Sequence, residues 1–487
     1  MGQHTQIGLE QIVALQSIVG DPDRVVWKDI PEEYSHDELG GNSVAPEVVV
    51  KASCTEEVAG VMRYAYEHNI PVTPRGAGTG LVGACVPVEH GIVLDLSGMK
   101  RILELDESNL TLTVQPGVLL MELASYVEDR GLFYPPDPGE KSATIGGNIS
   151  TNAGGMRAVK YGVTRDWVRG LTVVLPTGEV LKLGGKVVKN SSGYDLKDLF
   201  VGSEGTLGII TEAILRLIPK PAAVVSLLVP FPTLQKAIDT VPAIVASQSL
   251  PTAIEFMERE VILDAEKYLG KRFPDQNSEA YLLLKFDGAS LDEVEHAYAP
   301  VADLCLEHGA TDVFISDTEE REDSIWGARG AFLEAIKGST TEMDEVDTVV
   351  PRSQVNEMVA YFPRVSTKYG LRIKSFGHAG DGNLHAYLLR DDLSEEEFRR
   401  RLAAAMAAIY QKATELGGFV SGEHGIGLVK RPYLLKATDP AAVRLMVGIK
   451  HVFDPKNLLN PGKVFETTQE EQAHKENVAL PMELVAR

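Results

Sequence analysis

Two histidines lie close together in one short, glycine-rich stretch of the chain. His378 and His385 are seven residues apart in "SFGHAGDGNLHAYLLR", with Asp381 and Asn383 between them. If residues 371–390 form a hairpin with a four-residue loop, His378 lies opposite Asn383, and His385 is the diagonal neighbour on the same face. Two neutral imidazoles near one ion suit zinc, iron or manganese, and a carboxylate commonly completes such a site. The alternative is two histidines that are hydrogen-bonded within a turn.

A second stretch, "SGEHGIG" at 421–427, places a carboxylate and an imidazole side by side between glycines. Adjacent residues of an extended segment point in opposite directions. We therefore expect Glu423 to face a metal ion and His424 to face a substrate, where a histidine can serve as a general base. A flexible loop with a chance charged pair is the alternative.

The stretch "PRGAGTGLVGACVP" contains the dinucleotide-binding pattern G-x-G-x-x-G from Gly78 to Gly83, with Asp95 seventeen residues after Gly78. A dinucleotide-binding unit needs a helix directly after these glycines. Pro87 and the β-type run "GIVLDL" leave no room for one, so the sequence argues against NAD. What remains is a loop whose backbone N–H groups can bind an anion, or a tight turn in a β-rich domain.

Two further segments have the same small residues, "SATIGGNISTNAGG" at 142–155 and "GSEGTLGIITEAILRLIP" at 202–219. Glycine lets backbone approach a ligand closely. Three such segments within one part of the chain therefore indicate backbone packed against a large, flat ligand.

The totals exclude several classes of protein. A chain of 487 residues predicts two or three domains. The formal net charge of -22 repels phosphate backbones, so we expect no nucleic-acid partner. Cys54, Cys85 and Cys305 are too few and too far apart for a disulfide framework or an iron–sulfur cluster. With no signal peptide and no long apolar run, we expect a cytoplasmic protein that meets the inner face of a membrane only through a partner.

Strand and helix patterns must position these residues. Up to Pro221 the chain is glycine-rich, with short β-type runs and one amphipathic helix over 54–69. Beyond it, two successive strand–helix–strand patterns predict an antiparallel-rich α+β domain with helices on one face. The hairpin with the two histidines follows, then a long helix over 394–417.

From Pro46 to Pro221 the chain resembles the FAD-binding domain of the vanillyl-alcohol oxidase family. The motifs "GGNISTNAGG", "YGVTRDWV" and "GSEGTLGIIT" stand in that family's order. The resemblance implies an α+β fold: an N-terminal helical segment (1–45), a FAD-binding domain of two subdomains (46–221), a cap domain with an antiparallel sheet that binds substrate and metal (222–430), and a C-terminal helical segment that returns to the flavin (431–487).

In that family the first loop holds the FAD pyrophosphate, and the second and third segments follow the isoalloxazine. Many members attach FAD through a histidine in the first loop. Here neither histidine nor cysteine occurs in that loop before Cys85, so we expect non-covalent FAD. The residues implied to contact FAD are Arg75, Gly76, Ala77, Gly78, Thr79, Gly80, Leu81, Ser142, Gly146, Asn148, Thr151, Asn152, Gly155, Tyr161, Gly162, Glu204, Gly205, Ile210 and Asn460.

The motifs "GHAGDGNLH" and "GEHGIG", with "NPGKV" at 460–464, resemble the FAD-linked D-2-hydroxy acid dehydrogenases, a group that includes D-lactate dehydrogenases and the D subunit of glycolate oxidase. The resemblance implies that one divalent metal ion, zinc, iron or manganese, is bound by His378, His385 and Glu423. It further implies that Asn383 binds the substrate together with the metal, that His424 is the base, and that Arg329 in "WGARG" grips the substrate carboxylate. A solvated helix position is the alternative for Arg329.

Substrate length is where the chain departs from the D-2-hydroxyglutarate dehydrogenases. Those enzymes supply a lysine for the distal carboxylate, but here the matching stretch, "TTEMDEVDTVVPRS", is acidic. Repulsion from Glu342, Asp344, Glu345 or Asp347 would oppose a second carboxylate. We therefore expect D-lactate or glycolate, with D-2-hydroxyglutarate as the alternative.

The expected reaction oxidises the 2-hydroxy acid to a 2-oxo acid, with hydride transfer to flavin N5. The electrons would leave to an electron-transfer flavoprotein, an iron–sulfur subunit or a quinone, and a homodimer is compatible with the sequence. Two other classes remain open: a metallohydrolase with a His/His/Glu site, and a non-catalytic flavoprotein subunit of an electron-transfer complex.

Overall fold

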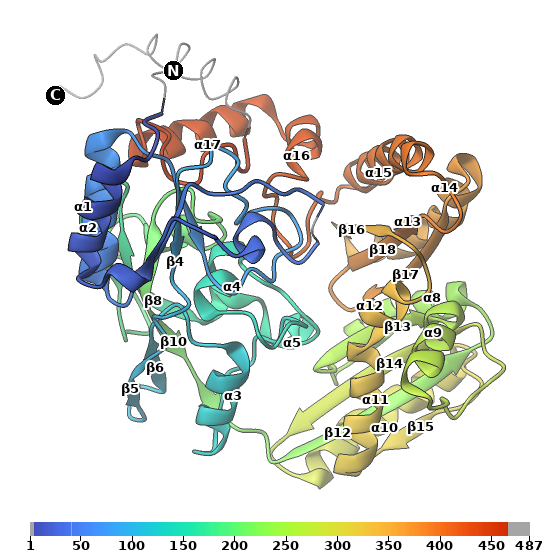
Figure 1. Cartoon of the computed structure of the whole chain (residues 1–487). Helices are drawn as coiled ribbons and strands as arrows, with labels where there is room; N and C mark the ends of the chain where they lie inside the picture. The colour runs from blue at the N-terminus through green and yellow to red at the C-terminus, as the bar shows by residue number, and fades with distance from the viewer. Residues whose placement is uncertain (1–3, 40, 466–487) are drawn as a thin grey trace.

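The computed structural model describes residues 4–39 and 41–465 of the chain. The described elements form two parts that lie side by side (Figure 1). The first part carries a four-stranded sheet, a five-stranded sheet and the two-stranded sheet β11-β7 (Ile218–Pro219 with Leu132–Phe133), and the second carries a single seven-stranded sheet. The first and last described helices both belong to the first part.

A four-stranded sheet carries the first glycine loop. Its strand order is β1-β2-β4-β3, with β2, β4 and β3 parallel and β1 antiparallel at the edge. Its elements are β1 (Val25–Val26), β2 (Val48–Lys51), β3 (Val72–Arg75) and β4 (Ile92–Asp95), packed against α1 (Leu9–Val19) and α2 (Thr55–His68), with the 3₁₀ turns η1 (Pro22–Arg24) and η2 (Glu32–Ser35) before β2. The chain runs from β3 to β4 without a helix, which removes the context that NAD binding would need.

A five-stranded antiparallel sheet completes the first part. Its order is β5-β6-β10-β8-β9, and the third glycine segment leads directly into the central strand β10. The strands are β5 (Ile102–Asp106), β6 (Thr111–Val114), β8 (Val168–Val174), β9 (Val180–Gly184) and β10 (Ile209–Arg216). The connecting elements are α3 (Leu120–Glu128), β7 (Leu132–Phe133), α4 (Ile145–Thr151), α5 (Ala158–Tyr161), α6 (Thr164–Trp167), α7 (Lys197–Phe200) and β11 (Ile218–Pro219).

The second part is built on a seven-stranded sheet in which every pair of strands is antiparallel. Its order is β15-β12-β14-β13-β17-β18-β16. The strands are β12 (Ala223–Phe231), β13 (Ala253–Glu258), β14 (Ala280–Gly288), β15 (Phe314–Ser316), β16 (Met343–Val349), β17 (Arg372–His378) and β18 (Asn383–Leu389). The predicted α+β architecture with an antiparallel sheet is confirmed.

Helices cover both faces of this sheet, so the expectation of helices on one face was wrong. The larger core lies under α8 (Leu234–Ala246), α10 (Leu291–Glu307), α13 (Val355–Val359), α14 (Phe362–Tyr369) and α15 (Glu395–Glu415), next to the 3₁₀ turn η3 (Arg352–Gln354). The other face packs against α9 (Arg259–Leu269), α11 (Glu319–Gly330) and α12 (Phe332–Lys337). The helix α11 buries only Ala328 and Arg329, so its apolar pattern in the sequence is weak.

Residues 458–460, near the end of the described range, lie beside the strand that leads into the first glycine loop. After α16 (Arg431–Ala437) and α17 (Pro440–Phe453), Leu459 forms a parallel bridge with Val72 at the start of β3. The N–H of Val72 donates to Leu458 at 2.8 Å, and the N–H of Asn460 donates back to Val72 at 2.7 Å. The predicted C-terminal segment 431–487 thus reaches the first part, and its residues 466–487 lie outside the described range.

Candidate active site

A cavity of about 720 Å³ lies between the two parts of the molecule. All three glycine-rich segments line it from the first part. From the second part it is lined by the face of the seven-stranded sheet that bears the two histidines, by α11, and by Glu423 and His424. The three glycine segments, the hairpin with the two histidines and the stretch 421–427 therefore meet at one cavity.

The first two glycine segments are packed so tightly that side chains would not fit at two points. Gly78 has φ +78°, and a Cβ there would lie 2.1 Å from Nη2 of Arg75. A Cβ on Gly76 would lie 2.3 Å from Oγ1 of Thr144, the residue that caps α4. Backbone, rather than side chains, is thus brought to the cavity wall, which fits a large, flat ligand with phosphates.

Most residues expected to contact FAD line this cavity. They are Arg75, Gly76, Ala77, Gly78, Thr79, Gly80, Leu81, Gly146, Asn148, Thr151, Glu204, Gly205 and Ile210. Ser142, Asn152, Gly155, Tyr161, Gly162 and Asn460 are not among the lining residues. Two of them make hydrogen bonds within the protein instead: Oδ1 of Asn152 accepts from the N–H of Arg165, and the hydroxyl of Tyr161 donates to Asp287.

The hairpin has the register that its sequence suggested. His378 pairs with Asn383 across β17 and β18, and His385 pairs with Phe376. The two imidazole rings lie 5.3 Å apart, centroid to centroid, and are perpendicular. Both are buried, and both line the cavity. The N–H of Asn383 donates to Oδ1 of Asp381, so this carboxylate stabilises the turn between the two strands.

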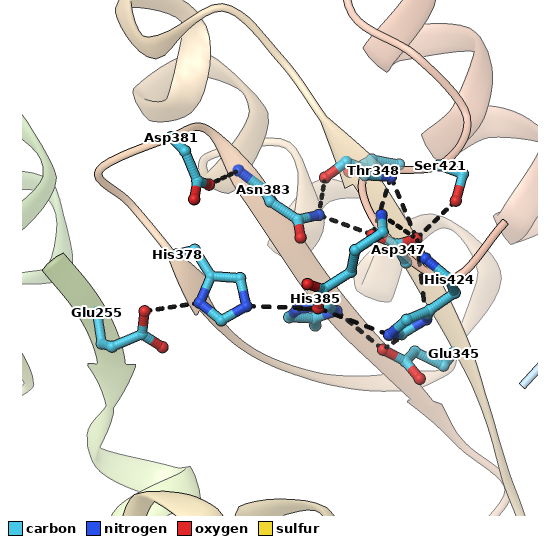
Figure 2. A network of polar contacts seen from close by, with 12 residues as sticks. Glu255, Glu345, Asp347, Thr348, His378, Asp381, Asn383, His385, Ser421 and His424 are labelled. Atoms are coloured by element: carbon cyan, nitrogen blue, oxygen red, sulfur yellow. Dashed lines mark hydrogen bonds and ion pairs between the residues drawn. The ribbon is translucent and has the colours of Figure 1, made fainter. Parts of the chain in front are cut away.

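Each of these imidazoles is held from behind by a buried carboxylate (Figure 2). Nδ1 of His378 lies 2.6 Å from Oε1 of Glu255, and Nδ1 of His385 lies 2.9 Å from Oε1 of Glu345. Burial alone would lower the pKa of His385, but Glu345 and Glu423 outweigh it and raise that pKa to about 9. The contacts on Nδ1 leave both Nε2 atoms free to face one point, which is the arrangement of metal-binding histidines.

Glu423 closes the group from the other side. Its Oε1 lies 3.4 Å from Nε2 of His378 and 3.3 Å from Nε2 of His385. Its Oε2 is buried and has no hydrogen-bond partner among the described residues. Two imidazoles and one carboxylate suit zinc, iron or manganese, and together with the unsatisfied carboxylate oxygen they fit the expected metal ion.

The backbone around Glu423 is curled, and this corrects the expectation that Glu423 and His424 point in opposite directions. The N–H groups of Gly422, Glu423 and His424 converge on the carboxylate of Asp347 at 3.1–3.3 Å. Both side chains consequently face the cavity, and Nε2 of His424 lies 3.7 Å from Oε1 of Glu423. The alternation rule failed because it holds only for extended chain.

Asp347 is fully buried in β16 and organises this loop. It also accepts from Oγ of Ser421 at 2.9 Å, from Nδ2 of Asn383 at 2.7 Å and from Nζ of Lys430 at 2.9 Å. Burial would raise its pKa, but the charges of Lys430 and His424, with others, hold that pKa well below its usual range. Asp347 is thus an anion that the fold surrounds with donors.

His424 lies beside His385 and Glu423, two of the three expected metal ligands. It also lies near two carboxylates of β16, Glu345 and Asp347. Its ring is stacked 5.3 Å from the ring of His385. Its Nδ1 lies 3.8 Å from both Oε1 of Glu345 and Oδ2 of Asp347. Carboxylates beside one ring nitrogen can orient a histidine so that its other nitrogen faces the substrate, which is the arrangement expected of a base.

Arg329 is buried and lines the cavity, so the alternative of a solvated helix position is wrong. Its Nε and Nη2 donate to Oε2 of Glu255 at 2.9 and 2.6 Å, and its guanidinium lies 4.5 Å from the ring of Phe376. Because Glu255 also contacts His378, one carboxylate positions both an expected metal ligand and the cation expected to bind the substrate carboxylate.

Asn383 is the one predicted substrate ligand that does not line the cavity. Its Nδ2 donates to Asp347 and to the carbonyl of Thr348 at 2.9 Å. A Cβ on Gly422 would lie 2.1 Å from that Nδ2, so the amide is pressed against the loop that carries Glu423. The amide is committed to supporting this loop, and we no longer propose it as a substrate ligand.

The acidic stretch 342–347 does not face the substrate cavity in the way that the expected repulsion of a second carboxylate requires. Only Glu345 lines the cavity, where it is bound to His385. Glu342 pairs with Arg390 and Arg399, and Asp347 supports the loop behind His424. Burial raises the pKa of Asp344 to about 6. These carboxylates support other groups, and their partners were not visible in the sequence.

Glu204 connects the first glycine-rich part to the loop after His424, and Asn460 holds the backbone of Glu204. The carboxylate of Glu204 accepts from the N–H groups of Ile426 and Gly427, both at 2.7 Å. Nδ2 of Asn460 donates to the carbonyls of Ala84 and Glu204 at 2.9 and 2.8 Å. The third glycine segment is thereby tied to the loop after His424 and to the C-terminal segment.

Comparison with known proteins agrees with this arrangement. Residues 46–184 match the FAD binding domain, and residues 220–464 match the C-terminal domain of FAD linked oxidases. The chain is 49% identical to the D-lactate dehydrogenase of Anaerostipes hadrus over 469 residues, which are 95% of this chain and 98% of that one. It is 42% identical to the glycolate oxidase subunit GlcD of Bacillus subtilis, over 89% of this chain and 92% of the relative.

The chain belongs to the FAD-linked D-2-hydroxy acid dehydrogenases of the vanillyl-alcohol oxidase family. It is an FAD-dependent oxidoreductase that acts on hydroxy acids. A D-2-hydroxyglutarate dehydrogenase from Stutzerimonas stutzeri is also related, at 34% identity over 86% of this chain and 91% of that one.

The fold is shared with more distant flavoproteins. The solved structure of p-cresol methylhydroxylase superposes with a TM-score of 0.77 at 20% identity, over 94% of this chain and 96% of that one. No helix within residues 4–39 and 41–465 combines the length and apolar character needed to cross a membrane.

Proposed function

We propose that this dehydrogenase oxidises a short D-2-hydroxy acid, D-lactate or glycolate, with the assistance of one divalent metal ion. The proposal of a metal ion rests on the carboxylate that contacts Nδ1 of each imidazole: Glu255 contacts His378, and Glu345 contacts His385. These contacts turn both Nε2 atoms toward Glu423. Such outer carboxylates fix the tautomer and orientation of metal-binding histidines.

The residues of the chain divide the remaining work. His424 lies beside the metal group and takes the proton of the substrate hydroxyl on Nε2, while Glu345 and Asp347 lie near Nδ1. Arg329 supplies a positive charge at the same cavity for the substrate carboxylate, in an orientation fixed by Glu255.

The two groups that the site would hold supply the remaining chemistry. FAD, held non-covalently by the three glycine segments, provides the acceptor for the hydride. A zinc, iron or manganese ion on His378, His385 and Glu423 would provide a Lewis acid that lowers the pKa of the substrate hydroxyl.

The electron acceptor is proposed to be a separate protein or a quinone. The three cysteines Cys54, Cys85 and Cys305 are unpaired in the structure and distant in sequence, which supports an acceptor outside this chain. An electron-transfer flavoprotein and an iron–sulfur subunit are the protein candidates. We further propose a cytoplasmic location, where thiols stay reduced, and we carry a homodimer forward as a proposal.

Anaerobic titration tests the reaction. D-lactate or glycolate should bleach the flavin absorbance at one equivalent, L-lactate should leave it unchanged, and removal of the metal by a chelator should abolish the bleaching. A flavin that no 2-hydroxy acid reduces would point instead to a non-catalytic flavoprotein subunit. Hydrolysis that depends on the metal and not on FAD would point to a metallohydrolase.

D-2-hydroxyglutarate gains support as a second candidate substrate. The repulsion expected from the acidic stretch 342–347 rested on four carboxylates, and only Glu345 lines the cavity. The structure thus leaves only one of the four carboxylates in a position to repel a second substrate carboxylate.

A further inference from the structure

Three cations line the part of the cavity where α5 and β14 meet. They are Lys141 and Arg157 from the first part of the molecule and Lys285 from β14 of the second. Nζ of Lys285 lies 4.2 Å from the centre of the Trp326 ring, which also lines the cavity. None of these three cations is an expected metal ligand or the expected base.

The carboxylates close to these cations do not balance them. Asp137 is shared, since it is bonded to Lys141 and lies 3.2 Å from Nη2 of Arg157. Lys285 has Glu322 at 3.7 Å. Burial raises the pKa of Glu322, and its Oε1 has no hydrogen-bond partner among the described residues, so it is a weak counter-ion.

Other groups near Lys285 are committed elsewhere. Asp287, two residues along β14, is paired with Lys160 and accepts from the hydroxyl of Tyr161. Burial and the charge of Arg157 lower the pKa of Lys285 to about 8. A positive group that is mostly buried, with a second cation nearby and only one weak anion in contact, favours an anionic ligand.

Lys285 lies close to the proposed metal ligand His378 on the sheet. Glu255, which contacts His378, pairs across β13 and β14 with Leu283. Lys285 is therefore the diagonal neighbour of Glu255 on the same face of the sheet, about 7–8 Å away between backbones. Along α11, Trp326 precedes Arg329 by three residues, or about 4.5 Å of helix axis.

We propose that Lys285, with Arg157 beside it, is a second anion subsite that binds a distal anionic group of the hydroxy acid. The inference rests on the proposed function, because it assumes that the near carboxylate binds at Arg329 and the metal group. It makes Lys285 a specificity-determining residue and extends the substrate class from D-lactate to 2-hydroxy acids that carry a second carboxylate. Trp326 packs on Lys285 and would limit the length of the carbon chain between the two anions.

The test compares Lys285→Met and Lys285→Arg with the parent holoenzyme. We expect Lys285→Met to lower kcat/KM for D-2-hydroxyglutarate relative to D-lactate roughly tenfold to hundredfold, as for the loss of one charge-assisted hydrogen bond. Lys285→Arg should restore most of that ratio because it keeps the charge. Lys182→Met, on an exposed position of β9, is the matched control and should leave the ratio unchanged.

A binding measurement that needs no turnover accompanies the kinetics. Glutarate should perturb the flavin absorbance of the parent at lower concentration than butyrate, and Lys285→Met should remove that difference. The preference for glutarate should also decline as the pH rises through about 8, because Lys285 then loses its charge. If no hydroxy acid bleaches the flavin, the proposed function fails, yet this measurement still tests the subsite.

Two results would overturn the proposal. One is an unchanged selectivity ratio and an unchanged glutarate preference in Lys285→Met. The other is an equal loss for D-lactate and D-2-hydroxyglutarate together with a shift in the flavin midpoint potential, which would assign these cations to the flavin rather than to the substrate.

Discussion

At the scale of single residues, the imidazoles are defined by the carboxylates behind them. Glu255 and Glu345 each contact an Nδ1 atom, so the nitrogen that faces Glu423 is fixed for His378 and for His385. A carboxylate in that position also raises the basicity of the imidazole toward a metal. The proposed metal ligands His378, His385 and Glu423 are distinct from the glycine segments proposed to hold FAD, although all of them line one cavity.

Removing a metal ligand should therefore leave the flavin in place. We expect His385→Ala and Glu423→Ala to lose the metal and turnover, since two ligands rarely hold a divalent ion tightly. Flavin content per chain should stay at the parent value, because the glycine segments lie in the other part of the molecule. Metal analysis and flavin absorbance check this, with His308→Ala on the exposed end of α10 as control. A mutant with full metal and normal activity would refute the ligand set.

The replacement of His424 separates the base from the ligands. We expect His424→Ala to slow flavin reduction by about 10²- to 10⁴-fold, the usual contribution of a general base. Metal and FAD should both remain, although Nε2 of His424 is only 3.7 Å from Glu423. Stopped-flow flavin reduction and metal analysis decide the matter. Loss of the metal would show that His424 is a ligand, and an unchanged rate would show that another group is the base.

At the scale of elements, strand β16 supports the site from behind. Its Glu345 contacts His385, and its Asp347 receives the three N–H groups that curl the loop before and at His424. Side chains two residues apart on a strand share a face, which is why both carboxylates point toward the same loop. The acidic stretch that the sequence suggested would repel a second carboxylate thus supports Glu423, the proposed metal ligand, and His424, the proposed base.

Asp347→Asn tests this support. An amide cannot accept from all the donors that surround Asp347, and it leaves Lys430 without its charged partner. We expect metal affinity to fall about 10- to 100-fold, as for other outer-sphere changes, while FAD is retained. Metal titration measures the affinity, and amide hydrogen exchange of residues 421–427 measures the order of the loop. Asp344→Asn on the same strand is the control, and equal effects of the two changes would contradict the assigned role.

At the scale of the whole molecule, the cavity is closed by segments from three distant regions of the chain. Glu204 accepts from the N–H groups of Ile426 and Gly427, and Asn460 connects the carbonyls of Ala84 and Glu204. The C-terminal segment also extends the sheet at Val72. The loop after His424 is therefore held by Glu204, and Glu204 is in turn held by a segment that comes later in the chain.

Asn460→Ala should loosen this connection. The side chain makes two buried hydrogen bonds from Nδ2, and the residue has φ +45°, a conformation that asparagine tolerates better than alanine. We expect the free energy of unfolding to fall by about 1–3 kcal/mol, and FAD to dissociate more readily. Denaturant titration followed by flavin fluorescence measures both. Asn277→Ala, at an exposed position, is the control; equal stability and flavin retention in both variants would show that Asn460 is dispensable.

The sequence by itself determined the cofactor class, the α+β fold and the residues that can bind a metal. Those features depend on residue types at short spacing: the glycines from Gly76 to Gly80, the two histidines of one hairpin, and the adjacent Glu423 and His424. A hairpin register follows from local pattern, and the structure has the pairing of His378 with Asn383 that the pattern indicated.

Only the tertiary structure decided which carboxylates support these residues and which way the catalytic loop turns. Glu255 and His378 are 123 residues apart, and Glu345 and His385 are 40 apart, so no local pattern links them. The curl at Glu423 depends on Asp347, which alternation along an extended chain could not reveal. Lys285 likewise meets Arg157 only because the two parts of the molecule close on one cavity. Long-range packing sets these contacts, whereas local spacing sets only the kinds of residue available to make them.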